Sequence, residues 1–115
     1  HLLHGKQAEH IACQLLQQHG LTLIAQNFRC RLGEIDLIML DDDTLVFAEV
    51  RYRKCTRYGS ALETVNQYKQ NRIIKTAHCY LNQYRIWQKH HCRFDIVSLG
   101  QQKNIWLKHA FGAIH

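Results

Sequence analysis

The sequence predicts an α/β fold in which a mixed β-sheet is flanked by helices. Two stretches have apolar residues at helical spacing, three alternating apolar stretches lie between them, and two more follow the second helix. The chain has 115 residues, of which 46% are hydrophobic, and this is the usual size of one domain built on one core. We therefore expect a single domain over residues 1–115.

The first half of the chain predicts one helix and three strands. Apolar residues recur at helical spacing over residues 6–19, and Gly20 then ends this helix. Strands are predicted over residues 21–28, 34–40 and 44–53, and the acidic run at residues 41–43 forms the tight turn between the last two. Because the connections are short, these strands should form an antiparallel meander.

The second half predicts a helix followed by two strands. The helix runs to about Tyr84, and its N-cap is either Ser60, with Glu63 completing a capping box, or Asn66. The strand over residues 92–99 is short and apolar, as expected in the middle of a sheet, and a strand over residues 105–108 would lie at an edge. The predicted order is therefore α-β-β-β-α-β-β.

Charge and cysteine usage narrow the classes of function. The chain has 15 Lys and Arg against 9 Asp and Glu, and this net charge of +6 favours phosphate-bearing partners such as nucleic acid. No apolar run is long enough for a membrane span, so we expect no membrane partner. The five cysteines never have Cys-x-x-Cys spacing, which argues against a zinc ribbon and suits reduced thiols in a cytoplasmic protein.

Two acidic residues, Asp36 and Glu49, interrupt strands that are otherwise apolar. Strand periodicity places Glu49 and Arg51 on one face, and hairpin pairing brings Asp36 alongside them. A carboxylate in a half-buried strand is costly unless a cation lies against it. The pattern therefore indicates either structural ion pairs with Arg51 or Arg53, or a site that binds a metal ion.

An ordered set of motifs resembles a known family. It comprises Ala8-Glu9, residues 26–31, 33–38 and 46–53, Gly59-Ser60, Lys69 and Arg93-Phe94-Asp95. Together they resemble the bacterial YraN-like family, which is grouped with Holliday-junction resolvases in the PD-(D/E)xK nuclease superfamily. The resemblance covers roughly residues 5–99 and implies a restriction-endonuclease-like αβββαβ core.

The resemblance implies a metal-dependent endonuclease that hydrolyses phosphodiester bonds in branched or junction-like DNA. Asp36, Glu49 and the Val50 carbonyl are hard oxygen ligands suited to Mg²⁺ or Mn²⁺, and Glu9 is the auxiliary carboxylate. Arg51 stands where the superfamily has a lysine. Arginine can stabilise negative charge but cannot act as a general base, so cleavage depends on whether another lysine substitutes.

Lys69 is the candidate for that substitution. Without a substitute, the same fold would serve as a nucleic-acid-binding module that does not cut. A partner-binding scaffold held by structural ion pairs is the third interpretation. Because related resolvases cut two symmetric strands, the resemblance also implies a homodimer.

Basic residues flank the predicted carboxylate site on three elements. Their common role would be to hold a phosphate backbone in a salt-dependent way. They are Arg29, Arg31, Arg53, Arg57, Lys69 and Arg72. Tyr52 and Tyr58 lie near them and either stack on unpaired bases or pack at the rim of the core.

Three further features carry weaker signals. His90-His91-Cys92 would point alternate side chains to opposite faces and form a poor zinc chelate. The acidic run at residues 41–43 lacks the glycine and glutamate of a calcium loop and is more typical of a turn. Asp95 either supports the metal site or is a structural hydrogen-bond acceptor.

Overall fold

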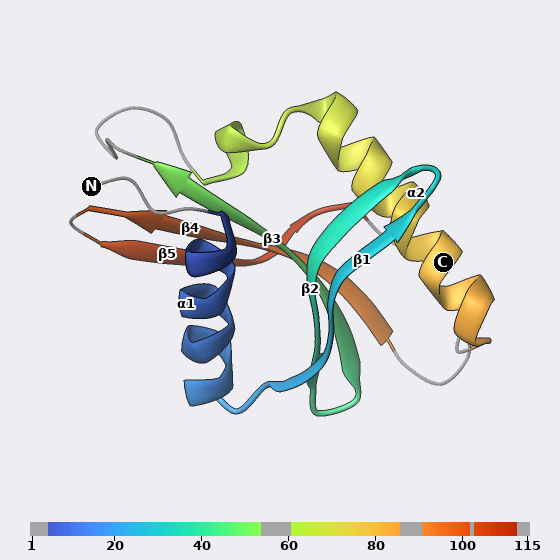
Figure 1. Cartoon of the computed structure of the whole chain (residues 1–115), viewed down its shortest axis with the longest axis horizontal. Coiled ribbons are helices and arrows are strands. Elements are labelled where there is room, and N and C mark those ends of the chain that lie inside the picture. Colours follow the sequence, from blue (N-terminus) through green and yellow to red (C-terminus); the bar gives the residue numbers. More distant parts are fainter. Residues whose placement is uncertain (1–4, 54–60, 86–90, 102, 113–115) are drawn as a thin grey trace.

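The computed structural model describes residues 5–53, 61–85, 91–101 and 103–112. It contains, in order, α1 (Gly5–Gln18), β1 (Thr22–Cys30), β2 (Gly33–Asp41), β3 (Thr44–Arg53), the 3₁₀ helix η1 (Leu62–Thr64), α2 (Gln67–Tyr84), β4 (His91–Gly100) and β5 (Asn104–Phe111) (Figure 1). This order confirms the predicted α/β class and the α-β-β-β-α-β-β sequence of elements. Arg57, Tyr58, Ser60 and His90 lie outside the described residues.

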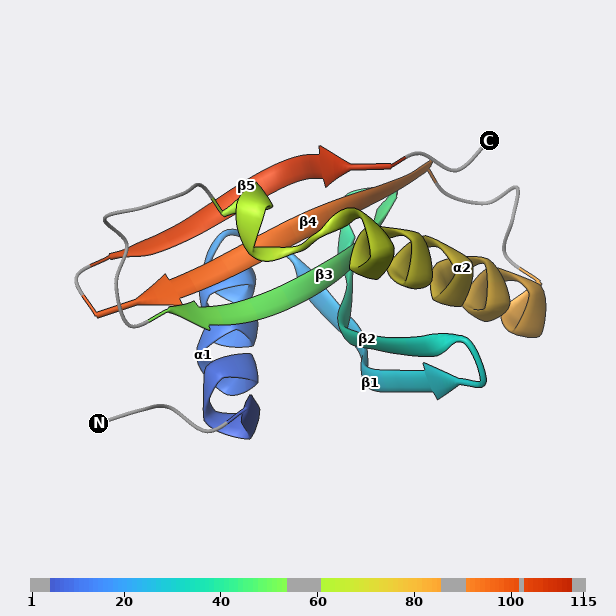
Figure 2. The same cartoon turned by 90° about the horizontal axis from the view of Figure 1, so that it is seen from above.

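The five strands form one mixed sheet in the order β1-β2-β3-β4-β5. Neighbouring strands are antiparallel except β3 and β4, which run parallel (Figure 2). A parallel pair needs a crossover connection, and α2 lies within that connection. The strand predicted as central, β4, lies inside the sheet, and β5 lies at an edge, as expected.

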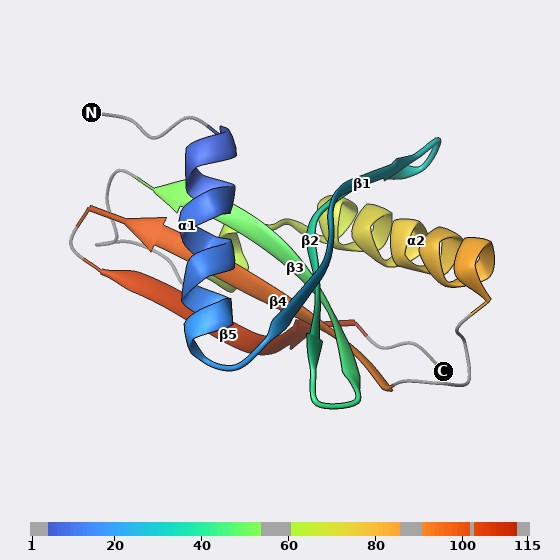
Figure 3. The same cartoon turned by 60° about the horizontal axis from the view of Figure 1, so that its bottom comes forward.

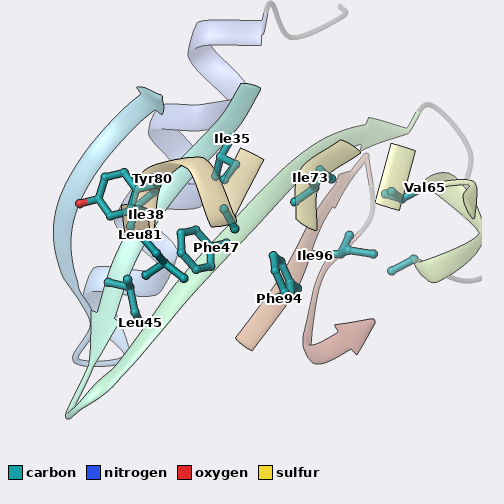
Figure 4. Packing of buried hydrophobic residues seen from close by; sticks show 12 residues of the cluster. Ile35, Ile38, Leu45, Phe47, Val65, Ile73, Tyr80, Leu81, Phe94 and Ile96 are labelled. Atoms are coloured by element: carbon teal, nitrogen blue, oxygen red, sulfur yellow. The ribbon is translucent and has the colours of Figure 1, made fainter. Parts of the chain in front are cut away.

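Helices cover both faces of the sheet, so the core has two parts. On one face α1 lies across the sheet (Figure 3). Its residue Leu16 belongs to a core cluster with Leu37 and Val97 of the strands. On the other face α2 and the segment around η1 pack against a cluster built around Phe47 and Phe94 (Figure 4). Both faces of the central strands are therefore buried, which explains their nearly continuous apolar sequences.

The β1–β2 hairpin leaves the rest of the sheet at Leu37. The β2–β3 ladder extends only from Leu37↔Ala48 to Asp41↔Thr44, whereas β1 and β2 stay paired as far as Cys30↔Gly33. The free end of the hairpin packs on α2, where the rings of Phe28 and Tyr80 meet edge to face at 5.0 Å. The divergence of β2 from β3, beyond Leu37 and Ala48, forms a fork whose open side faces α2 (Figure 1).

The start of α2 is set by Asn66. Its side-chain oxygen accepts a hydrogen bond from the Lys69 backbone N–H at 2.8 Å, which is the usual N-cap geometry. The structure thus assigns the cap to Asn66, one of the two alternatives that the sequence left open. No helix in the described ranges is long and apolar enough to cross a membrane.

Candidate functional site

A cleft of about 540 Å³ lies at the fork, between the β1–β2 hairpin, β3 and α2. Its walls combine acidic, basic and aromatic side chains. The lining residues are Arg29, Cys30, Gly33, Glu34, Asp36, Glu49, Tyr68, Lys69, Arg72 and Ile73. The two carboxylates singled out in the sequence therefore reach one cleft, together with three of the predicted phosphate-binding residues.

Asp36 lies at the first β2 position beyond the β2–β3 ladder. Its Oδ2 accepts a hydrogen bond of 2.8 Å from the Val50 backbone N–H, a donor that the end of the ladder leaves without a strand acceptor. This bond orients the carboxylate toward β3. Across the described part of the chain, no lysine or arginine forms an ion pair with Asp36 within 4 Å.

Glu49 lines the cleft and is nearly buried, with only 4% of its surface exposed. Its Oε2 lies 3.3 Å from Lys69 Nζ and 3.5 Å from Arg51 Nη1. These two cations offset the cost of burying the carboxylate, which would be high without a partner. Lys69 lies in the first turn of α2, and the Asn66 cap holds the backbone of that turn.

The proximity of the two carboxylates perturbs Asp36. Burial, and next the negative charge of Glu49, raise the pKa of Asp36 to about 7. The hydrogen bond from Val50 acts in the opposite direction but does not offset these effects. Near neutral pH Asp36 therefore retains its proton in part of the molecules, and another cation could replace that proton.

Glu9 approaches Asp36 from α1 and is not a lining residue of the cleft. Its Oε1 accepts a hydrogen bond of 2.9 Å from Asn27 Nδ2. Burial and the charge of Asp36 raise the pKa of Glu9, while the Asn27 bond lowers it. The predicted grouping of Glu9 with Asp36 is therefore observed, but Glu9 reaches Asp36 from α1 and lies beside the cleft without lining it.

The remaining basic residues divide between the cleft and other surfaces. Arg29 lines the cleft and pairs with Glu34 at 3.1 Å, and Arg72 lines it from α2. Arg51 is not a lining residue and acts on the site only through Glu49. Arg31 is exposed and Arg53 is half-buried, and these two of the predicted phosphate-binding residues do not line the cleft.

Tyr52 does not face the cleft. It packs against the core cluster on the α1 face, which agrees with the packing alternative and not with base stacking. The acidic run at residues 41–43 is the β2–β3 hairpin turn, in which Asp41 pairs with Thr44 and Asp42 has a left-handed φ of 54°. His91 is exposed while Cys92 packs against the core, as expected for alternate positions of a strand.

Asp95 is a structural acceptor. It is fully buried, and its carboxylate accepts hydrogen bonds from the Arg93 guanidinium, from Trp106 Nε1 at 2.9 Å and from the His109 backbone N–H at 3.0 Å. Asp95 pairs in register with Ala48, whose side chain packs on the α1 face. Asp95 therefore lies on the face opposite Glu49 and does not support the Asp36–Glu49 pair.

The Asp36–Glu49 pair has the chemistry that a hard divalent cation requires. Both groups are carboxylates, both line a cleft open to solvent, and Asp36 has a raised pKa because it is buried near Glu49. Within the described ranges, no group of three or more His, Cys, Asp or Glu side chains is arranged to hold a metal ion. The donor set therefore fits an ion that keeps several water ligands, as Mg²⁺ does, and does not fit a closed structural metal site.

Comparison with known proteins identifies the family. The model of the Uncharacterised protein family UPF0102 matches residues 8–99 of this chain. The chain belongs to UPF0102. This match confirms the resemblance to the YraN-like family, and it spans every carboxylate of the candidate site.

Curated UPF0102 proteins match over nearly their whole length. The one from Stutzerimonas stutzeri (strain A1501) is 49% identical, with 93% of this chain and 92% of that protein covered. The one from Nitrosococcus oceani is 47% identical, with 93% and 90% covered, and "UPF0102 protein Pfl01_4685" of Pseudomonas fluorescens (strain Pf0-1) is 46% identical, with 96% and 94% covered. Since these names state no activity, the function of this UPF0102 member has to be argued from its site.

Sequence reasoning missed two residues of the site. Asn27 lies opposite Asp36 in the β1–β2 pairing and has a left-handed φ of 50°, a conformation that asparagine adopts more readily than most residues. In the sequence, only an amide side chain within a strand of alternating pattern pointed to Asn27. Tyr68 lines the cleft from the first turn of α2, and its position could be found only once Asn66 was known to be the cap.

Proposed function

We propose that this UPF0102 member is a metal-dependent endonuclease that hydrolyses phosphodiester bonds in branched or junction-like DNA. The observation that carries the proposal is the Asp36–Glu49 pair in a solvent-open cleft, with Lys69 Nζ 3.3 Å from Glu49. The αβββαβ order of elements supports membership of the PD-(D/E)xK superfamily. DNA, and Mg²⁺ or Mn²⁺, are the substrate and cofactor in this proposal.

Asp36 and Glu49 would hold the divalent ion. When bound, such an ion polarises a phosphoryl oxygen and makes a coordinated water more acidic. The Val50 N–H keeps Asp36 in place, and Lys69 and Arg51 hold the Glu49 carboxylate. These contacts preorganise the pair, so that little reorganisation is needed when the ion and the phosphate arrive.

Lys69 would take the role of the lysine that Arg51 replaces on β3. Its ammonium lies at the carboxylate pair and lines the same cleft, so it can orient a water molecule and place positive charge against a phosphate. Arg51 supplies fixed positive charge from behind Glu49. Arg29 and Arg72 on the cleft walls would bind neighbouring phosphates.

Cleavage of labelled DNA tests the proposal. The purified protein is incubated with branched and linear duplexes, with Mg²⁺ or Mn²⁺ or with a chelator. Wild-type protein should cleave the branched DNA only with the ion present. Asp36→Asn, Glu49→Gln and Lys69→Met should each lower the rate by about a hundredfold or more. Asp42→Asn in the exposed β2–β3 turn and Lys103→Met beyond β4 are the matched controls and should keep the wild-type rate.

Three outcomes separate the interpretations. Cleavage that persists in both carboxylate variants comes from a contaminant and refutes the enzyme. Salt-sensitive binding without any cleavage supports the alternative, a binding module of the same fold, which the arginine at position 51 favours. Absence of DNA binding at low salt refutes both.

A further inference from the structure

Tyr68 is an aromatic side chain held in water at the rim of the cleft. It is 70% exposed, the highest value among the large apolar side chains in the described ranges, yet it lines the cleft that holds Asp36 and Glu49. An aromatic ring stabilises the fold when it is buried, so this exposed ring contributes little to the stability of the core. Its exposure is therefore not explained by packing.

The ring is oriented by Arg72, one helical turn further along α2. Arg72 Nη1 donates a hydrogen bond of 3.3 Å to Tyr68 Oη, and the guanidinium carbon lies 5.8 Å from the ring centroid. Lys69, the next residue in the chain after Tyr68, reaches Glu49. The start of α2 thus presents an aromatic face and two cations beside the carboxylate pair.

We infer that Tyr68 stacks on an unpaired base of the nucleic acid, while Lys69 and Arg72 contact the adjoining phosphates. The inference rests on the proposed function and narrows its substrate to DNA with at least one unpaired base at the cleft. Bases inside a continuous duplex are covered on both faces by their neighbours. An exposed ring at the site can therefore select frayed, flapped or branched strands over intact duplex.

Tyrosine at this position also suits stacking that does not depend on sequence. Every base has a π-face, so an aromatic ring accepts any of them, and no side chain of the cleft has to read base edges. Stacking was one alternative for Tyr52 and Tyr58; the Tyr52 side chain packs on the α1 face instead, and Tyr58 lies outside the described residues, so Tyr68 is the ring that we assign to this role.

Equilibrium binding of fluorescently labelled DNA tests the inference. Anisotropy is measured for a single strand, a duplex with a single-stranded flap and a blunt duplex, at one ionic strength and with Asp36→Asn as the background to prevent cleavage. Tyr68→Ala should weaken binding of the first two DNAs by about tenfold and of the blunt duplex by less than about twofold. Tyr68→Phe should bind like the parent protein, since it keeps the ring and loses only the hydroxyl that accepts from Arg72.

Tyr84 provides the matched control. It is 53% exposed at the other end of α2 and contacts Tyr80, so Tyr84→Ala removes a similar ring outside the cleft and should leave all three affinities unchanged. Equal weakening of all three DNAs by Tyr68→Ala would assign the residue to positioning Arg72 and overturn the stacking role. Unchanged affinities would overturn it too, while the proposed endonuclease remained intact. If the parent protein binds none of the DNAs, the proposed function itself fails.

Discussion

Replacing Asp36 with asparagine should remove a pH dependence of folding stability. In the folded protein Asp36 has a pKa of about 7, raised by burial and by Glu49, whereas the unfolded chain loses this proton near pH 4. Between these values the folded state binds the extra proton, so stability falls as pH rises, and it levels off above about pH 7. Asparagine is uncharged at every pH, so the Asp36→Asn variant should not lose this stability as the pH rises.

The size of the effect follows from the pKa shift. A rise from 3.8 to about 7 corresponds to about 4 kcal/mol of stability lost at alkaline pH, of which roughly 3 kcal/mol develops between about pH 5 and pH 8. Asparagine keeps an oxygen to accept from the Val50 N–H and gains an amide that can donate to Glu49. The variant should therefore match wild-type stability near pH 5 and exceed it near pH 8.

Urea denaturation followed by tryptophan fluorescence, with a chelator present, measures this difference. Other groups of the protein also contribute to the pH dependence of stability, so the quantity to compare is the free energy of unfolding of wild type minus that of the variant at each pH. The stability of the control variant Asp42→Asn, in the exposed turn, should show the same pH dependence as wild type. If the stability of Asp36→Asn follows the same pH dependence as wild type, burial and the charge of Glu49 do not raise the pKa of Asp36.

Two further predictions concern the metal and the opposite face of the sheet. Near pH 8, excess Mn²⁺ or Mg²⁺ should raise the thermal unfolding midpoint of wild type and of Asp42→Asn. At an ion concentration a hundredfold above Kd, the increase should be equivalent to about 3 kcal/mol. The midpoint of Asp36→Asn should not change. An equal shift in all three proteins would place the ion elsewhere. Asp95→Asn should destabilise the fold by about 2 kcal/mol in urea, because the largely buried Arg93 then keeps one acidic partner, Asp41, of the two that it contacts. The same variant should keep the Mn²⁺ shift, and loss of that shift would mean that Asp95 does support the site.

Local sequence pattern was sufficient for most of the secondary structure. The apolar spacing located both helices and all five strands, because the side chains facing a core recur with the period of the element itself. The predicted boundaries differ from the observed ones by a few residues, most at β5, which continues past the polar pair Lys108-His109 to Phe111. The cap of α2 was undecided, since Ser60 and Asn66 are both good capping residues.

The pairing of Asp36 with Glu49 also followed from sequence, because a hairpin brings residues at matching distances from its turn side by side. The tertiary structure alone decided which other groups meet that pair. Lys69 is 20 positions from Glu49 in the chain and reaches it because the crossover between β3 and β4 lays α2 over the fork. Glu9 and Arg51, equally plausible by pattern, lie beside the cleft without lining it.

The periodicity of the sequence therefore predicts which face of a helix or strand a residue occupies, and the register of a hairpin predicts its neighbour on the adjacent strand. The sequence pattern does not predict where β2 separates from β3 or which helix covers the fork, because both depend on packing between segments that are distant in the chain. The sequence thus specified an α/β fold with a paired carboxylate on adjacent strands. The fork, the cleft, the Lys69 contact and the exposed ring of Tyr68 come from the way β2 parts from β3 and packs against α2.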